Sequence, residues 1–328
     1  MRHIFVINPL AGKKGRTQRL EEQIRAAGAR LGEQVEIYET KFQGDGERFV
    51  RKTCEEQTGN EKVRFYACGG DGALNEVANG AFGFANAEVG CVPLGTGNDY
   101  VRNYASPQAF LDIEAQLRGR AVDSDLIRYV QEEGEEVEEA GAFRYCVNMF
   151  NIGFDCNVVD QTSRAKNWPL VKGSFAYLLS VAIILIKKEG ADLKVYYEDG
   201  TSFDGKLLLI AVANGCFCGG GVKGLPLSIL DDGLLDVSLI KDVPRRTFIR
   251  LFPKYAKGVH LGDKRAQEII DYRKCRKLTI APNSGKMKLC VDGEILYTGK
   301  VSFEIVPRAM RFSVPAGVGA GPGPNKRL

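Results

Sequence analysis

The sequence predicts two successive domains, an α/β domain followed by a β-rich domain. Strand-like and helix-like patterns alternate over the first 125 residues, and short β-like runs separated by turn dipeptides follow them. The length of 328 residues lies between that of one large domain and that of two ordinary ones. The apolar content of 44% is typical of a globular protein.

In the first part, short buried-type runs alternate with helical periodicity. The strand candidates are the runs 3–7, 35–38, 63–68 and 89–94. The helix candidates are 17–31, an amphipathic stretch around Phe49 and Val50, and 73–81. This alternation predicts right-handed βαβ units, and therefore a doubly wound parallel sheet with helices on both faces.

In the second part, the period changes to that of antiparallel strands. The strand candidates are 193–197, 206–212, 278–280, 287–291 and 301–306. Turn dipeptides such as Asp199-Gly200 separate them, which favours a sandwich or an open barrel. The uncharged run 173–186 predicts a helix, but its 14 residues fall short of the ~20 that are needed to cross a bilayer. The Gly- and Pro-rich end, 317–328, predicts a disordered tail.

Composition excludes two classes of protein. Forty-five basic and forty-one acidic residues give a net charge of only +4, so we expect no nucleic-acid partner. Nine scattered cysteines without a C-x-x-C pair, and only two histidines, argue against a structural zinc site. Unpaired cysteines in this number fit a reducing cytosol.

Three Gly-rich segments follow three of the predicted parallel strands. They are Asn8-Pro9-Leu10-Ala11-Gly12, Gly69-Gly70-Asp71-Gly72-Ala73-Leu74-Asn75-Glu76 and Pro93-Leu94-Gly95-Thr96-Gly97-Asn98-Asp99. Open α/β sheets bind ligands at the carboxyl ends of their strands, and glycines let backbone N–H groups approach phosphate oxygens. One such segment is often only a tight turn, but three at one sheet edge predict a phosphate site.

Two acids lie inside these segments, Asp71 and Asp99. An acid beside a polyphosphate is repulsive unless a divalent cation lies between them, so the pattern favours a Mg²⁺-nucleotide. The alternative is that either acid serves as a helix cap or turn residue. No Walker loop is present, and no G-x-G-x-x-G motif follows the first predicted strand, which argues against P-loop and nicotinamide-binding folds.

The motif series resembles the catalytic domain of diacylglycerol, sphingosine and ceramide kinases, and most of all the soluble bacterial diacylglycerol-kinase-like lipid kinases. The resemblance extends over roughly residues 3–307 through Asn148-x-x-x-Ile152-Gly153, Asp231-Asp232-Gly233 and Asp292-Gly293-Glu294. It implies an α/β nucleotide-binding domain like that of phosphofructokinases and NAD kinases, over 1–126 and rejoined by 308–316. A β-sandwich lipid-substrate domain is expected over 127–307, with the active site in the cleft between the two domains.

The resemblance also implies roles for individual residues. Glu294 corresponds to the general base, and Asp71 and Asp99 would hold the catalytic Mg²⁺. Asp232, with the carbonyls of Ile229 and Leu234, matches a structural Mg²⁺ site, supported by Asp125 or by the neighbouring Asp123. The residues that would line the ATP site are Asn8, Pro9, Leu10, Ala11, Gly12, Thr40, Gly69, Gly70, Asp71, Gly72, Ala73, Leu74, Asn75 and Thr96.

These features predict an ATP-dependent lipid kinase that phosphorylates a lipid hydroxyl, with diacylglycerol as the first candidate. We expect a cytoplasmic protein that meets the inner membrane face peripherally and reversibly. Pairing of edge strands into a homodimer is left open. Two alternatives stand beside this hypothesis: a soluble-metabolite kinase of the NAD kinase type, and a lipid-binding module without catalysis. The helix at 173–188 and the basic residues Lys13, Lys14 and Arg16 are candidate contacts for lipid or phosphate, although core packing and solvated charge are the commoner roles of such segments.

Overall fold

The computed structural model describes residues 1–12, 16–57, 61–131, 144–154, 156 and 190–319. The chain forms two compact units, described here one at a time. The N-terminal unit consists of Met1–Leu126, Leu230–Gly233 and Val306–Leu328, and the C-terminal unit consists of Ile127–Ile229 and Leu234–Ile305. The chain passes from one unit to the other inside two long strands, β5 (Arg120–Gln131) and β15 (Val301–Val314).

A parallel sheet forms the centre of the N-terminal unit. Its strands are β1 (Arg2–Ile7), β2 (Val35–Glu39), β3 (Val63–Gly69) and β4 (Ala87–Pro93), joined by the last part of β15. The order is β2-β1-β3-β4-β15, and all neighbours are parallel. Every residue of β3 and β4 is buried, because both faces of these strands are covered.

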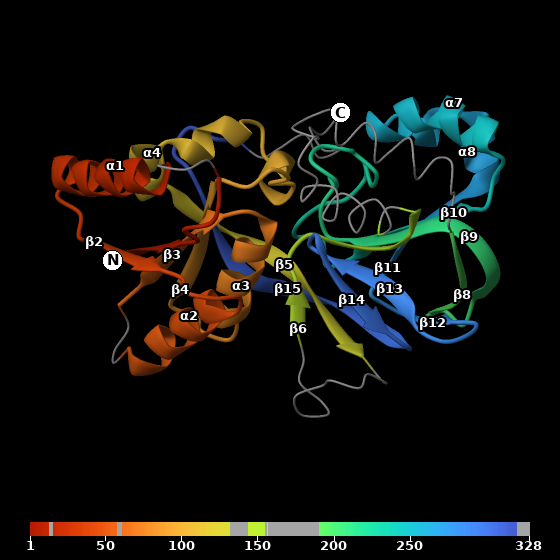
Figure 1. Cartoon of the computed structure of the whole chain (residues 1–328), viewed down its shortest axis with the longest axis horizontal. Helices are drawn as coiled ribbons and strands as arrows, with labels where there is room; N and C mark the ends of the chain where they lie inside the picture. The colour runs from red at the N-terminus through yellow and green to blue at the C-terminus, as the bar shows by residue number, and fades with distance from the viewer. Residues whose placement is uncertain (13–15, 58–60, 132–143, 155, 157–189, 320–328) are drawn as a thin grey trace, which may run out of the picture. The chain divides into compact units, whose positions relative to one another are not determined.

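Helices cover both faces of this sheet, so the unit is doubly wound (Figure 1). One pair is α1 (Arg16–Leu31) with α4 (Ile113–Leu117), and the other is α2 (Asp45–Glu56) with α3 (Asp71–Ala81). The short helices η1 (Tyr100–Asn103) and η2 (Pro107–Leu111) precede α4. Helix α1 buries Leu20 and Ile24 against Phe5 and Ile7 of β1, as its helical spacing predicts.

The C-terminal unit is built from antiparallel strands. They include β6 (Arg144–Cys146), β7 (Met149–Gly153), β8 (Ala191–Tyr197), β9 (Ser202–Ala213), β10 (Leu235–Lys241), β11 (Ile270–Cys275), β12 (Lys277–Pro282), β13 (Met287–Val291) and β14 (Glu294–Thr298). Between β10 and β11 lie α7 (Arg245–Ala256), η3 (His260–Gly262) and α8 (Lys264–Ile269). Along the sheet, the order runs β14-β13-β7-β9-β8-β12-β15, and β10 pairs with β9 and β11.

One apolar core holds these strands together, with Phe150, Val195 and Phe303 fully buried in it. The predicted strands 193–197, 206–212, 278–280, 287–291 and 301–306 fall within β8, β9, β12, β13 and β15. The predicted Asp199-Gly200 turn joins β8 to β9, where Gly200 has a positive φ of 83°. The predicted helix at 173–188 lies outside the described residues, as do Lys13 and Lys14.

Other predictions concern the tail, the thiols and the membrane. Within the predicted tail, residues 317–319 are described, and Val318 is buried. All nine cysteines carry free thiols. Among the residues that the structure describes, no helix is both long enough and apolar enough to span a membrane.

Both histidines are buried, and burial lowers the pKa of His3 and of His260 to about 4. Between pH 6.5 and 4 the unfolded chain therefore binds protons that the folded chain does not, and the free energy of unfolding falls as the pH falls. At pH 5.5 each histidine should remove about 1.4 kcal/mol relative to pH 7.5. Urea unfolding of the wild type and of a His3→Gln/His260→Gln variant at several pH values tests this. The free energy of unfolding of the variant should change much less between pH 7.5 and 5.5 than that of the wild type. An equal change in both proteins would contradict the prediction.

Candidate functional site

Three loops of the N-terminal unit meet at the carboxyl edge of its parallel sheet. The loops comprise residues 8–12, 69–72 and 94–99. The Asn8 N–H donates to the Cys68 carbonyl (3.0 Å). The N–H groups of Leu94 and Gly95 both donate to the Gly69 carbonyl, at 2.8 and 3.1 Å. The segments that the sequence predicts to converge are therefore hydrogen-bonded to one another.

The second and third loops touch backbone to backbone. A Cβ added at Gly95 would lie 2.5 Å from the Gly70 Cα, and one added at Gly69 would lie 2.5 Å from the Ala73 Cβ. A side chain at Gly69 or Gly95 would therefore force the neighbouring atoms to shift. The loops consequently present main-chain atoms at this edge, which is the arrangement that phosphate oxygens need for hydrogen bonding to N–H groups.

Replacing Gly95 with Ala should therefore destabilise the protein by about 1–3 kcal/mol and weaken binding of the nucleotide that the sequence predicts, because the backbone of one loop must move away from the other. Gly319→Ala is the matched control, since a Cβ there meets nothing within 4 Å. Thermal unfolding and nucleotide titration measure both effects. If the melting temperature and nucleotide affinity of Gly95→Ala equalled those of Gly319→Ala, the close contact between the two loops would contribute nothing to stability or binding.

Asp71, the first residue of α3, holds the third loop in place. Its two carboxylate oxygens accept the N–H groups of Asn98 and Asp99, each at 2.8 Å. Asn98 has a positive φ of 52°, and its side-chain amide bonds both the N–H and the carbonyl of Gly95. Asp71 thus accepts hydrogen bonds from the backbone of the third loop. This agrees with the cap or turn role that the sequence analysis gave as an alternative to Mg²⁺ binding.

A second acid converges on the same point. A Cβ at Gly97 would lie 2.8 Å from Asp71 Oδ2 and 3.4 Å from Asp99 Oδ2, so the two carboxylates border the space above this glycine. Asp99 is buried and also contacts the guanidinium of Arg102 at 3.5 Å. In the described part of the chain, no three His, Cys, Asp or Glu residues are arranged to bind a metal. Mg²⁺ commonly uses only one or two carboxylates together with substrate phosphates, so this pair fits Mg²⁺.

The remaining predicted nucleotide contacts differ in exposure. Asn8 accepts the Leu10 N–H through its side chain, in an Asx turn that leaves Leu10 91% exposed. Thr96, at the tip of the third loop, is exposed, whereas Leu74 is buried and could offer only its backbone. The other predicted contacts, Pro9, Ala11, Gly12, Gly70, Gly72, Ala73 and Asn75, are exposed or half-buried.

Thr40 follows β2, and its N–H and hydroxyl both donate to the Ile7 carbonyl, at 2.9 and 3.3 Å. The next turn is fixed by Glu76, whose two oxygens accept the N–H groups of Gly44 and Gly46 at the start of α2. The motif glutamate therefore caps a neighbouring helix, a role that the sequence analysis does not assign to it.

Of the two acids offered for the structural metal loop, Asp125 is the one that contacts the loop. It is fully buried and accepts the N–H groups of Gly233 and Arg308, both at 2.7 Å. Burial raises the pKa of Asp125, and the charges of Asp232 and Asp231 raise it further. Asp123 instead pairs with Arg311 at 3.6 Å. Asp125 therefore holds the backbone of the loop that contains Asp232, and a single carboxylate with backbone carbonyls is a set of hard oxygen donors that fits a divalent cation.

Glu294 belongs to the C-terminal unit, where it is the exposed first residue of β14. The turn before it has positive φ at Asp292 (45°) and Gly293 (92°), as a type I′ hairpin turn requires. The Asp292 carboxylate accepts three successive N–H groups, those of Val147, Asn148 and Met149, at 2.8–3.0 Å. Asp292 thereby fixes the turn from which Glu294 projects.

Three residues of this arrangement were missed by the sequence analysis: Glu76, Asn98 and Asp292. Each lies inside or beside a motif that was recognised, and each serves the backbone. The tolerance of Asn for left-handed φ and the Asp-Gly dipeptide are signals that could have identified Asn98 and Asp292. No local signal could have identified the acceptor role of Glu76, whose partners lie 30 and 32 residues earlier.

Comparison with known families divides the chain in two. Residues 2–129 match the diacylglycerol kinase catalytic domain, and residues 148–314 match the YegS C-terminal NAD kinase beta sandwich-like domain. The expected fold class, an α/β domain with a C-terminal β-sandwich, is thereby confirmed.

Curated relatives resemble the whole chain. A probable lipid kinase YegS-like from Pseudomonas aeruginosa is 31% identical over 301 residues, with 90% of this chain and 91% of the relative covered. A diacylglycerol kinase from Bacillus subtilis is 28% identical over 306 residues and covers 92% of each chain. Among solved structures, a diacylglycerol kinase from Bacillus anthracis superimposes with a TM-score of 0.64 at 19% identity, over 95% of this chain and 96% of that one. Another chain from that organism gives 0.70 at 20% identity, with the same coverage.

Proposed function

The chain belongs to the family of YegS-like lipid kinases and diacylglycerol kinases, and from that premise we propose that it transfers the γ-phosphate of ATP to diacylglycerol, giving phosphatidic acid. The observation that carries the proposal is the junction of the three glycine loops, with the Asp71 and Asp99 carboxylates both bordering the space above Gly97. Family membership identifies the acceptor as a lipid. The choice of diacylglycerol rests on the proteins of that name that the chain resembles.

In the proposed reaction, the chain mainly positions groups and neutralises charge, as phosphoryl transfer requires. Backbone N–H groups of the three loops and the exposed Thr96 hydroxyl bind the phosphates. Asp71 and Asp99 would hold Mg²⁺, which offsets the charge of the transferred phosphoryl group when it is bound.

Glu294 then accepts the proton of the lipid hydroxyl as that oxygen bonds to the γ-phosphorus. The bond from the γ-phosphorus to the β–γ bridging oxygen breaks, and ADP leaves. Asp292 fixes the turn that carries Glu294 through the three backbone N–H groups that it accepts. Asp292 is therefore a positioning residue in this scheme, and Glu294 is the base.

The proposal is tested by incubating the protein with radiolabelled ATP and a panel of acceptors: diacylglycerol, monoacylglycerol, a sphingoid base, phosphatidylglycerol and NAD. Label in phosphatidic acid, with little in the other products, is the expected result. Label in another lipid would correct the acceptor and keep the kinase. Label in a nucleotide product would favour the metabolite kinase, and no transfer at all would favour a lipid-binding module.

We also propose that Asp232, with the carbonyls of Ile229 and Leu234, holds a structural Mg²⁺ that the buried Asp125 supports. Mg²⁺ should then raise the melting temperature of the wild type in the absence of nucleotide, because it binds only the folded loop. Asp232→Asn should abolish this shift, whereas Asp123→Asn, a matched change two residues from Asp125, should retain it. A wild-type melting temperature that does not respond to Mg²⁺ would remove the metal from this loop.

A further inference from the structure

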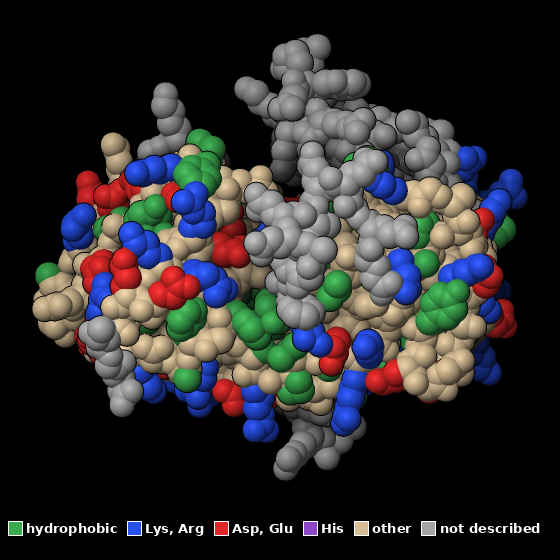
Figure 2. Space-filling view, turned by 90° about the horizontal axis from the view of Figure 1, so that it is seen from below, with side chains coloured by type: hydrophobic (Ala, Val, Ile, Leu, Met, Phe, Trp, Pro, Cys, Tyr) green, Lys and Arg blue, Asp and Glu red, His purple; other side chains and the backbone are tan. Residues whose placement is uncertain are grey.

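The segment from Arg245 to Arg265 concentrates positive charge on the C-terminal unit. It contains seven basic side chains and one acidic side chain, a formal charge of +6, whereas the whole chain carries only +4. On the face of the molecule shown in Figure 2, by contrast, acidic and basic side chains are interspersed. The segment comprises α7, η3 and α8, and we call its exposed side the α7–α8 surface.

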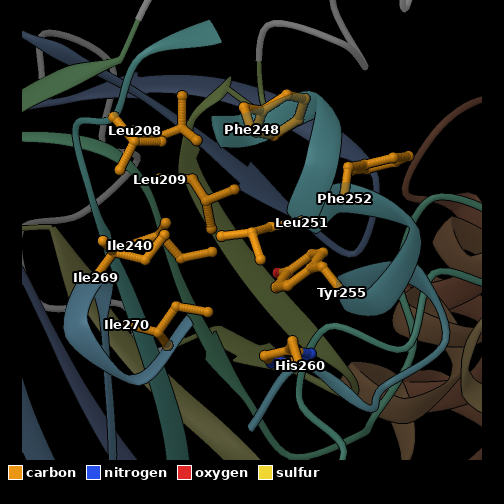
Figure 3. A pocket seen from close by; sticks show the side chains of 11 residues that line it. Leu208, Leu209, Ile240, Phe248, Leu251, Phe252, Tyr255, His260, Ile269 and Ile270 are labelled. Atoms are coloured by element: carbon orange, nitrogen blue, oxygen red, sulfur yellow. The ribbon is translucent and has the colours of Figure 1, made fainter. Parts of the chain in front are cut away.

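Helix α7 is amphipathic, and its inner face is well anchored. Phe248, Leu251 and Tyr255 point toward Leu209 and Ile240 of the sheet (Figure 3). The cavity that remains among these side chains amounts to only about 30 Å³, room for about one water. The inner face is therefore filled by the protein itself, and the outer face is the side that is available to a partner.

The outer face carries cations that have no acidic partner. Arg246, Arg250 and Lys257 recur at helical spacing on α7 and its C-cap, and Lys264 and Arg265 begin α8. Within the described part of the chain, none of these five side chains forms an ion pair. Lys254 differs, because it pairs with Asp263.

A groove lies among these cations. Arg250, Lys254, Lys264 and Arg265 line it together with Asp263, and its volume is about 350 Å³. Four positive side chains against one carboxylate make the groove a site for anionic groups of phosphate size.

Two apolar side chains stand among the charges. Ile249 on α7 and Val259 before η3 are each 58% exposed. A helix that exposes Arg, Lys and a bulky aliphatic residue on one face matches the interfacial helices that lie on anionic bilayers. Nucleic acid would satisfy the charges, but it would leave Ile249 and Val259 in water.

We propose that the α7–α8 surface docks the protein on an anionic phospholipid bilayer, with the five unpaired cations on the phosphate groups and Ile249 and Val259 inserted between the lipids. The proposal deepens the proposed function and rests on it for one point, that the substrate is held in a membrane. Among the described residues, no helix could span a membrane. The α7–α8 surface would be the part of the protein that reaches the membrane and its lipid substrate.

Sedimentation with vesicles tests the docking surface directly. The wild type should bind vesicles of phosphatidylglycerol and phosphatidylcholine, and it should release them at high salt. The variant Arg246→Glu/Arg250→Glu/Lys257→Glu should bind at least about 100-fold more weakly. Ile249→Ser should weaken binding about tenfold with little change in its salt dependence.

The matched control reverses three exposed cations elsewhere on the same unit, Lys206→Glu/Arg276→Glu/Lys277→Glu. It makes the same change in net charge, so it separates a specific surface from general attraction. Equal loss in both triple variants, or no loss in the α7 variant, would overturn the proposal. So would binding of the wild type to homopolymeric RNA but not to vesicles.

Activity separates failure of the docking surface from failure of the proposed function. With diacylglycerol in anionic vesicles, the α7 variant should lose as much activity as binding. With a water-soluble short-chain diacylglycerol, it should retain the wild-type rate, since α7 carries none of the proposed catalytic residues. Loss of both activities in a variant that melts like the wild type would overturn the docking role. A wild type that phosphorylates neither substrate would refute the kinase proposal, while the vesicle assay would still decide the surface.

Discussion

Replacing Glu294 with Gln is expected to lower the rate of lipid phosphorylation by about 10²–10⁴-fold, the usual contribution of a general base. The amide keeps the size of the side chain but cannot accept the proton of the attacking hydroxyl. Glu294 is exposed, and the turn before it is held by Asp292, so the fold and the affinity for ATP should not change. The measurement is kcat with diacylglycerol, together with the Kd for ATP.

Two variants make this result specific to Glu294. Glu55→Gln, the same substitution at an exposed position of α2, should keep full activity. Asp292→Asn should lower kcat as well, because the Val147 N–H, which donates to Asp292 Oδ2, would then face an amide nitrogen. Unlike Glu294→Gln, it should also lower the melting temperature. A Glu294→Gln enzyme that turns over at the wild-type rate would remove Glu294 from the role of base.

Asp71→Asn is expected to reduce activity by more than about 100-fold and to destabilise the protein by about 1–3 kcal/mol. Both Asp71 oxygens accept a backbone N–H, and an amide can accept only one of them. The third loop should therefore lose its position even before nucleotide or metal binds. Thermal unfolding without Mg²⁺ measures the loss of stability. Titration with ATP in the presence of Mg²⁺ then measures the loss of nucleotide binding.

The comparison with Asp99→Asn distinguishes the two acids. Asp71 accepts two backbone N–H groups of the third loop, whereas Asp99 faces the Arg102 guanidinium at 3.5 Å, so substitution of Asp99 should affect activity with Mg²⁺-ATP more than stability. An Asp71→Asn variant with wild-type stability in the absence of Mg²⁺ would show that the hydrogen bonds to Asn98 and Asp99 contribute nothing to the fold.

Periodicity was sufficient to predict most of the N-terminal unit. The predicted runs 3–7, 35–38 and 63–68 differ from β1, β2 and β3 by one residue at an end, and 17–31 differs from α1 in the same way. Their apolar side chains face the core, buried in β1, α1 and β3 and half-buried in β2, so the hydrophobic pattern is enough to indicate these segments.

Helix α7 was not predicted, although Phe248, Leu251, Phe252 and Tyr255 have helical spacing. Pro253 lies inside this helix and Pro244 is its N-cap, and both residues ordinarily indicate an interruption. Packing of the apolar face against the sheet overrides that local preference.

The candidate site, like the fold, was predicted only in part from the sequence. The sequence indicated that the loops around Gly69 and Gly95 would converge, because parallel strands place their ends at one edge. It could not indicate which acids serve the backbone, since Asp71, Glu76 and Asp292 accept N–H groups that are distant in the chain. Hydrogen bonds of this kind depend on the folded geometry.

The central claim is that the Asp71 and Asp99 loops and Glu294 act in one reaction. A crystal structure of the protein with Mg²⁺ and a non-hydrolysable ATP analogue tests it most directly. The account predicts the triphosphate on the three glycine loops, and the Glu294 carboxylate close enough to the γ-phosphorus for one lipid hydroxyl to contact both. A nucleotide bound elsewhere, or a Glu294 carboxylate too far from the γ-phosphorus for a shared hydroxyl, would contradict it.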